Sequence, residues 1–103
     1  MKFIFKVKLI KRMTTQKDLS DIYLIKHNSK VFEPHTLVKY ITCSYSGDCY
    51  LISDFNDDLK REWIMYYDLY PVDWKNKHDN YRWYYNSNFQ EIADSLIAKY
   101  QLC

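Results

Sequence analysis

The chain of 103 residues contains one glycine, Gly47, and no long uninterrupted run of apolar residues. Loops that cradle nucleotide phosphates need several closely spaced glycines, because the backbone N–H groups must approach the anion. A membrane-spanning helix needs about 18 or more consecutive apolar residues. The sequence therefore excludes nucleotide-binding loops of the Walker and dinucleotide types, and it predicts a protein that does not enter a membrane.

Patterned metal-binding and catalytic motifs are also missing. Cys43, Cys49 and Cys103 form no C-x-x-C pair, and the three histidines are scattered along the chain. Zinc sites and nucleophilic sites need particular residue types held in a fixed arrangement. A zinc site built from Cys43, Cys49 and His35 has no supporting motif, and neither has a cysteine-dependent active site. We predict a non-enzymatic protein with no cofactor, and we keep a small cysteine-dependent enzyme as an alternative.

The sequence lacks the features of a secretory signal. Its first residues are basic, but Lys6 and Lys8 interrupt the apolar run, and no small-residue cleavage site follows. A cytoplasmic location is the prediction, in the host cytoplasm if the protein is viral. Cysteines in that compartment are kept reduced.

The residues that are present suit one globular domain over residues 1–103. Hydrophobic residues make up 48% of the chain and charged residues 27%, which is ordinary for a soluble domain. Aromatic residues reach 18%, with eleven tyrosines, and this share is high. The usage of Ile, Lys, Asn and Tyr is typical of an AT-rich genome, as in many phages and mobile elements.

The N-terminal segment alternates between apolar and basic residues, which predicts a half-buried strand over residues 2–10. One face carries Phe3, Phe5, Val7 and Leu9. The other side of the segment and the residues after it form a candidate basic face, which consists of Lys2, Lys6, Lys8, Lys11 and Arg12. Residues 1–40 hold nine Lys or Arg against three Asp or Glu, whereas residues 41–103 hold six against ten. This dipolar charge could steer a charged partner.

The next two segments predict a helix and a β-hairpin. The spacing in residues 15–27 favours a helix, although Ile22–Ile25 would also suit a strand. The pattern in residues 35–55 predicts two strands joined by a three-residue turn at residues 45–47, with Gly47 at the position of positive φ. In that register Cys43 lies opposite Cys49, and Thr42 lies opposite Tyr50.

Two further helices are predicted. Residues 56–70 begin with acidic residues, end before Pro71, and place an apolar stripe on one helical face. The stripe consists of Leu59, Trp63, Tyr66, Tyr67 and Tyr70. Residues 87–100 keep amphipathic spacing after a capping-box pattern of Ser87 and Gln90. The predicted fold class is α+β, an antiparallel sheet of three to five strands with two or three helices packed on one face.

The densest aromatic segment is residues 63–85, which hold nine of the nineteen aromatic residues. If residues 81–85 form a strand, Tyr81, Trp83 and Tyr85 share one face, and Arg82 shares the other with Tyr84. Arg82 keeps its charged head in water, so one of the two faces is exposed, and the sequence leaves open which one. Tyr, Trp and Arg on a surface are typical of interaction hot spots. The candidate partner-binding residues are Trp74, Tyr81, Arg82, Trp83 and Tyr84.

The predicted function is docking onto a macromolecular partner, a host protein or a ribonucleoprotein complex, by a monomer or a homodimer. The most specific form of this prediction is an accessory protein of a phage, virus or mobile element that inhibits a host defence complex, as anti-CRISPR proteins do. The alternative is a nucleic-acid-binding protein that combines the basic N-terminal strand with an aromatic stacking patch. The Asp and Asn residues around the aromatic segment favour a protein partner.

Overall fold

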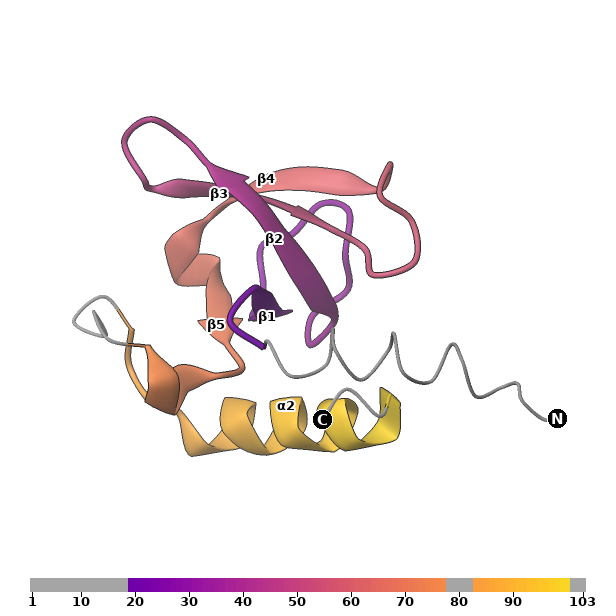
Figure 1. Cartoon of the computed structure of the whole chain (residues 1–103), viewed down its shortest axis with the longest axis vertical. Helices are drawn as coiled ribbons and strands as arrows, with labels where there is room; N and C mark the ends of the chain where they lie inside the picture. Colours follow the sequence, from indigo (N-terminus) through magenta and orange to yellow (C-terminus); the bar gives the residue numbers. More distant parts are fainter. Residues whose placement is uncertain (1–18, 78–82, 101–103) are drawn as a thin grey trace, which may run out of the picture.

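The computed structural model describes residues 19–77 and 83–100. These residues form five antiparallel strands, and the sheet order is β4-β3-β2-β1-β5 (Figure 1). The strands are β1 (Ile22–Ile25), β2 (Leu37–Cys43), β3 (Cys49–Ser53), β4 (Arg61–Met65) and β5 (Leu69–Pro71). Two 3-10 turns, η1 (Tyr66–Asp68) and η2 (Trp74–Asn76), and the helix α2 (Ser87–Tyr100) are the other elements of the described residues. The predicted strand over residues 2–10 lies outside the described residues.

The predicted antiparallel sheet is present, but the predicted number of helices is wrong. Within residues 19–77 and 83–100, α2 is the one α-helix, and it takes the place of the two or three that we expected. The segment predicted as a helix over residues 56–70 contains β4, η1 and part of β5. The described part of residues 15–27 contains β1 instead of a helix.

Residues 61–65 form the strand β4, in which burial alternates with a period of two. Ile64 is buried, whereas its neighbours Trp63 and Met65 are exposed and half-buried. β-Branched and aromatic side chains suit a pleated surface that is covered on one side. Pro71 does not end a helix here. It lies in the edge strand β5, where the missing N–H costs no ladder hydrogen bond.

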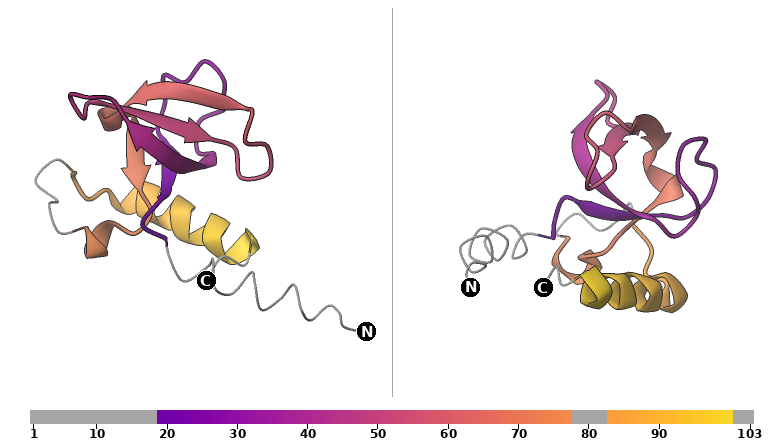
Figure 2. Two further views of the ribbon diagram at one scale, coloured as in Figure 1. Left: turned by 45° about the horizontal axis from the view of Figure 1, so that its top comes forward. Right: turned by 90° about the vertical axis from the view of Figure 1, so that its right-hand side faces the viewer.

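The sheet is strongly curled. β4 and β5 are its two edges, so they are separated by four strand spacings, about 19 Å in a flat sheet. The connection between them is η1, which has three residues, and three residues span only about 10 Å when extended. The sheet must therefore bend until its two edges approach each other, and Figure 2 shows this curvature.

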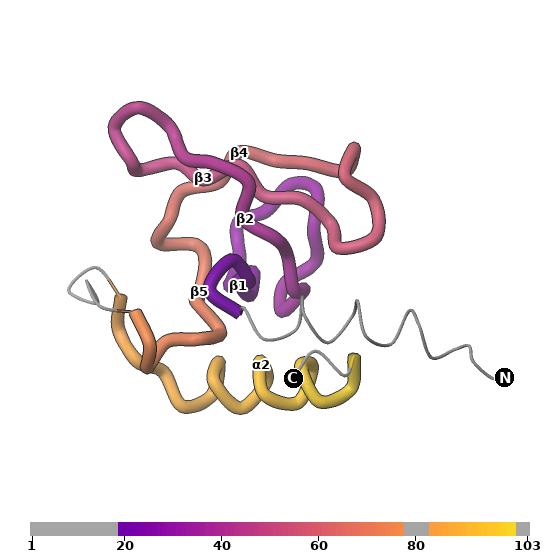
Figure 3. The backbone as a smooth tube through the Cα atoms, in the orientation of Figure 1, coloured from indigo at the N-terminus to yellow at the C-terminus, as the bar shows by residue number. Residues whose placement is uncertain are grey.

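β1 lies between two apolar clusters, and all four of its residues are buried. Tyr23 and Ile25 face the interior of the curled sheet. Ile22 and Leu24 face the opposite side, where α2 contributes Ala93 to the second cluster. Figure 1 and Figure 3 show α2 beside β1 and β5, far from β4. The helix therefore covers one end of the sheet and leaves β4 uncovered.

The hairpin between β2 and β3 is confirmed, but the predicted register is wrong by one residue. Gly47 has a φ of +83°, as its place in the turn predicted. However, the main-chain N–H of Ser44 donates to the carbonyl of Cys49 at 2.8 Å, so the loop has four residues rather than three. Cys43 therefore lies opposite Tyr50, and the predicted Cys43–Cys49 pair does not form.

The helix over residues 87–100 is also confirmed, but its cap differs from the predicted one. The side-chain oxygen of Asn86 accepts a hydrogen bond from the N–H of Phe89 at 3.0 Å. Asn86, rather than Ser87, therefore caps the helix. Gln90 turns toward the sheet, where its side chain accepts a hydrogen bond from the Tyr70 hydroxyl at 2.7 Å and donates one to the carbonyl of Val72 at 3.1 Å.

Replacing Gly47 with alanine tests the turn. A Cβ atom at this position would meet no atom within 4 Å, so the expected cost is conformational only. We expect Gly47→Ala to lower the free energy of unfolding by about 1 kcal/mol, because L-residues other than glycine resist positive φ. Gly47→Asn should cost less, because asparagine tolerates this region. Urea denaturation of the two variants measures both values, and equal stability of wild type and Gly47→Ala would contradict the expectation.

Candidate interaction surface

The outer face of β2, β3 and β4 carries a row of apolar side chains. Leu51 lies opposite Trp63 on β4, and Thr42 lies opposite Leu51 on β2. A bulge between Tyr40 and Thr42 places Ile41 on this face as well. The Trp63 side chain is 53% exposed and that of Ile41 is 39% exposed. A solvent-facing sheet surface is ordinarily polar, so this row is unusual.

Sulfur-containing side chains lie at one end of this row, and cationic side chains lie at the other end. Cys49 lies opposite Met65, and their sulfur atoms are 3.2 Å apart. At the other end of the strands, Lys39 and Arg61 flank Ser53. We call Ile41, Leu51, Trp63 and Met65 the outer-face patch. No described element covers it, since α2 lies at the opposite end of the molecule (Figures 1 and 2).

The loop before β4 is fixed by polar contacts of its own side chains. The side chain of Asp54 accepts a hydrogen bond from the N–H of Asn56 at 2.9 Å, and that of Asp57 accepts one from the N–H of Leu59 at 3.0 Å. Lys39 forms a salt bridge with Asp58 at 3.4 Å. Such Asx turns fix the backbone locally. The loop is therefore ordered by its own acidic residues, two of which, Asp57 and Asp58, were predicted to lie in the first turn of a helix.

The residues predicted to bind a partner are distributed over several environments. Trp83 is only 7% exposed and belongs to the core, whereas Tyr84 is 84% exposed. Trp74 is partly buried against both apolar clusters. Tyr81 and Arg82 lie outside the described residues. So does the whole candidate basic face of Lys2, Lys6, Lys8, Lys11 and Arg12.

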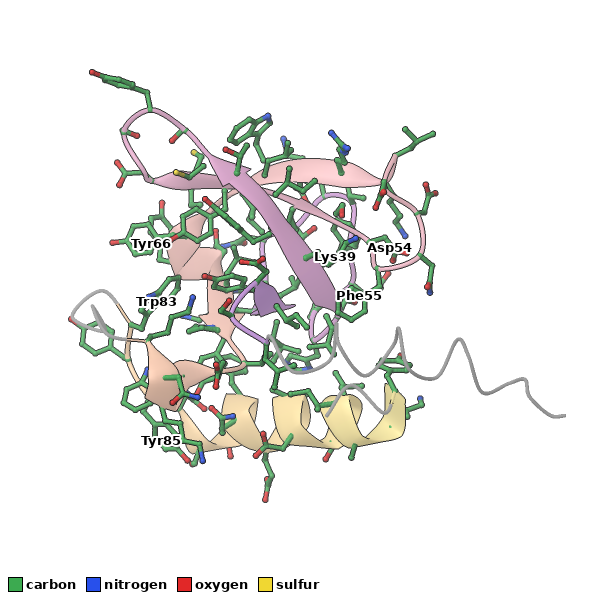
Figure 4. All side chains as sticks on the ribbon, in the orientation of Figure 1. Lys39, Asp54, Phe55, Tyr66, Trp83 and Tyr85 are labelled. Carbon is green, nitrogen blue, oxygen red and sulfur yellow. The ribbon has the colours of Figure 1, made fainter. Side chains whose placement is uncertain are left out.

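Trp83 is part of an aromatic cluster inside the curled sheet. Its ring centroid lies 5.7 Å from that of Tyr23, 6.3 Å from Tyr50 and 5.8 Å from Tyr66. Figure 4 shows Tyr66 and Trp83 on the side of the molecule away from Phe55. Burial raises the pKa of the nearby Tyr40 to about 12, and a hydrogen bond with the Cys43 side chain adds to the shift. These rings form structural packing rather than a stacking platform.

A cleft of about 780 Å³ lies between η2 and α2. Its walls include Trp74, Tyr85, Val72 and Ile97, and Asp94 on α2 accepts a hydrogen bond from Gln90 at 3.1 Å. The ring centroids of Trp74 and Tyr85 are 5.3 Å apart. The indole Nε1 of Trp74 is buried, and within the described residues it has no hydrogen-bond partner. The cleft has the size of a small-molecule site, but its few polar groups mostly bond to each other.

The cysteines and histidines do not converge on a site. Cys43 is exposed and Cys49 is half-buried, and both are free thiols. His27 lies 3.7 Å from Asp68, and the ring of His35 contacts that of Phe89. Residues 19–77 and 83–100 contain no group of three or more His, Cys, Asp or Glu side chains that could hold a metal ion.

The outer-face patch was not predicted, because the helical spacing of residues 59–70 puts Trp63 on a buried stripe. The signal that could have found it is the alternation from Arg61 to Met65, in which Trp63 shares a face with the charged Arg61.

Comparison with models of known protein families, with curated protein sequences and with solved structures gives no match. In the part of the chain that the structure describes, no helix combines the length and apolar character that a membrane crossing requires.

Proposed function

We propose that the protein is a non-enzymatic binding module that docks onto another protein through the outer-face patch. The observation that supports the proposal is the exposed Trp63, aligned with Leu51 and Ile41 on a sheet face that no described element covers. Apolar patches on soluble domains mark interaction sites. Tryptophan is the residue type most enriched at the energetic centre of such sites, because it contributes a large contact area with few rotatable bonds.

A protein partner fits the described residues better than a nucleic acid. The whole chain has a formal net charge of +2, which falls short of the strongly basic balance of a dedicated nucleic-acid-binding protein. The predicted stacking platform also needed Trp83, whose ring is buried. The more specific proposal, an accessory protein of a phage, virus or mobile element that inhibits a host defence complex, rests on residue usage alone.

Substitution of Trp63 tests the proposal. Trp63→Ser removes the centre of the patch and should weaken the captured complex by about 2 kcal/mol or more, roughly 30-fold in Kd. The measurement is affinity capture from host lysate with the full chain, followed by calorimetry with the recovered partner.

Tyr100→Ser is the matched control. Tyr100 is 52% exposed, nearly the same as Trp63, but it lies on α2 and lines a separate pocket with His35, Phe55 and Leu96. Both variants change exposed side chains and should stay within about 0.5 kcal/mol of wild-type stability. If Trp63→Ser retained full affinity for a partner that the wild type binds, the patch would not be the docking surface.

A further inference from the structure

In the described sheet β4 pairs with β3 on one side only, so its other edge is open (Figure 1). The N–H of Asp54 donates to the carbonyl of Lys60, and the N–H of Tyr66 donates to the carbonyl of Asp48. In an antiparallel pair, alternate residues bond across to the neighbouring strand and the residues between them face away. Lys60, Tyr66 and the alternate residues between them therefore bond to β3.

The remaining residues of β4 present their N–H and C=O groups to the open edge. These are Arg61, Trp63 and Met65, and within residues 19–77 and 83–100 no hydrogen bond reaches their main-chain groups. Such an edge is a template for pairing with another strand, which many proteins prevent with proline or a bulge. β4 contains no proline, and its register with β3 has no bulge.

The β1–β2 loop contacts β4 through one side chain. Glu62 accepts hydrogen bonds from the Ser29 hydroxyl at 2.6 Å and from the Lys30 N–H at 2.9 Å. Glu62 shares the inner face of β4 with the buried Ile64, because side chains two residues apart in a strand point to the same side. The loop is therefore held on the inner side of β4, and the main-chain groups of the edge stay unpaired.

The opposite edge of the sheet, β5, offers no comparable site. Leu69 and Pro71 are the residues of β5 that face away from β1. Pro71 has no N–H, and the N–H of Leu69 already donates to the carbonyl of Tyr66. The described sheet therefore has one edge that accepts a strand. Pairing between identical edges about a two-fold axis closes at two copies and does not extend into a fibre.

We infer that the occupant of the β4 edge is β4 of a second copy of this chain, paired antiparallel about a two-fold axis. Such an axis passes through one position of the strand, and the residue at that position faces itself. An axis at Arg61 would place two guanidinium groups opposite each other, and an axis at Glu62 would do the same with two carboxylates. Like charges directly opposite each other destabilise a strand pair.

An axis at Trp63, the middle residue of β4, pairs the strand over its whole length. Trp63 then faces Trp63 of the second copy, and Arg61 faces Met65 of the second copy on each side of the axis. Each of these pairs exchanges two main-chain hydrogen bonds. Glu62 lies opposite Ile64 of the second copy, so no like charges meet.

Side chains on the outer face strengthen this register. The two indoles lie directly opposite each other, and aromatic pairs at such positions stabilise strand pairing. Arg61 lies diagonal to Trp63 of the second copy, within reach of a long side chain, so its guanidinium and the indole form a cation–π pair. Arg61 and Trp63 are both exposed in the single chain. The pairing also joins the two outer-face patches into one surface.

The test combines sedimentation velocity of the purified full chain with amide hydrogen exchange by NMR, at concentrations from about 10 µM to about 1 mM. The sedimentation coefficient should rise with concentration. The amides of Trp63 and Met65 should exchange at least about tenfold more slowly at the highest concentration than at the lowest, because they are bonded only in the dimer. The amide of Ile52, whose side chain is fully buried in β3, is the folding reference and should stay protected throughout.

Met65→Pro removes one donor from the edge. Met65 has a φ of −68°, which proline adopts without strain, and the preceding Ile64 is extended as proline requires. In the pair, each substitution removes a hydrogen bond and points the proline ring at the carbonyl of Arg61 of the second copy. The Kd of the dimer should therefore rise at least about 30-fold. Met65→Leu keeps the N–H and an apolar side chain, so this variant should dimerise as the wild type does.

A full chain that sediments as a monomer at every concentration, with Ile52 protected, would overturn the inference. Slow exchange of Trp63 and Met65 that does not change on dilution would also overturn it, since the edge would then be covered within one chain. So would a folded Met65→Pro variant with wild-type dimerisation. If Met65→Pro did not fold, the concentration dependence of the wild-type amides would still decide. None of these results depends on whether the outer-face patch binds a protein partner, because only the purified chain is measured.

Discussion

Replacing Trp83 with alanine should lower the free energy of unfolding by about 3–5 kcal/mol, because the loss of a buried tryptophan leaves a large cavity. The indole is 7% exposed and lies against Tyr23, Tyr50 and Tyr66. For a domain of about 100 residues this corresponds to a fall of roughly 15–25 °C in Tm. Thermal and urea denaturation followed by circular dichroism measure the effect.

Tyr84→Ala is the matched control for Trp83→Ala, because it removes the neighbouring aromatic ring, which is 84% exposed. Its stability should stay within about 0.5 kcal/mol of the wild-type value. If the two variants proved equally stable, Trp83 could not be part of the core. The pair therefore tests in solution that Trp83 is buried and that Tyr84 is exposed.

Replacing Ala93 with arginine should destabilise the protein by at least about 3 kcal/mol, since the site has no room for a long side chain and no partner for a charge. Ala93 is fully buried between α2 and the sheet, in the cluster that contains Leu24 and Tyr70. The expected result is detachment of α2, which would appear as a large loss of near-ultraviolet circular dichroism together with a lower Tm.

Ala98→Arg places the same side chain on the exposed surface of the same helix. Arginine is a good helix former, so this variant should fold with nearly wild-type stability. A wild-type Tm for Ala93→Arg would mean that α2 does not pack against β1 and β5.

The parts of the fold that the sequence predicted are those in which one local pattern decides the structure. Residues 87–100 keep apolar side chains at helical spacing over a length that no strand reaches, so α2 was predictable. Gly47 marked the hairpin because no other residue in the chain accepts positive φ as readily. Its register was not predictable to one residue, because the choice between a three-residue and a four-residue loop depends on how both strands pair.

The errors arose where tertiary packing overrides periodicity. Tyr66, Tyr67 and Tyr70 happen to fall at helical spacing, but in the structure they belong to a 3-10 turn and a strand. Ile22–Ile25 is buried on both sides, so it has no alternation by which a strand could be recognised. The same spacing conceals the candidate site, since a helix over residues 56–70 would bury Trp63. The exposure of an aromatic ring depends on which elements pack against it, and local sequence patterns do not specify this packing.

The position of β1 between two clusters has a consequence for synthesis of the protein on the ribosome. On one side β1 pairs with β2, which is synthesised soon after it. On the other side it pairs with β5, which is synthesised much later. The second cluster is complete only when α2 supplies Ala93 and Ile97. Contacts so distant in sequence form late. The apolar segment Ile22–Ile25 therefore remains incompletely covered until α2 has left the ribosome. During that interval the segment is exposed to aggregation and to chaperones.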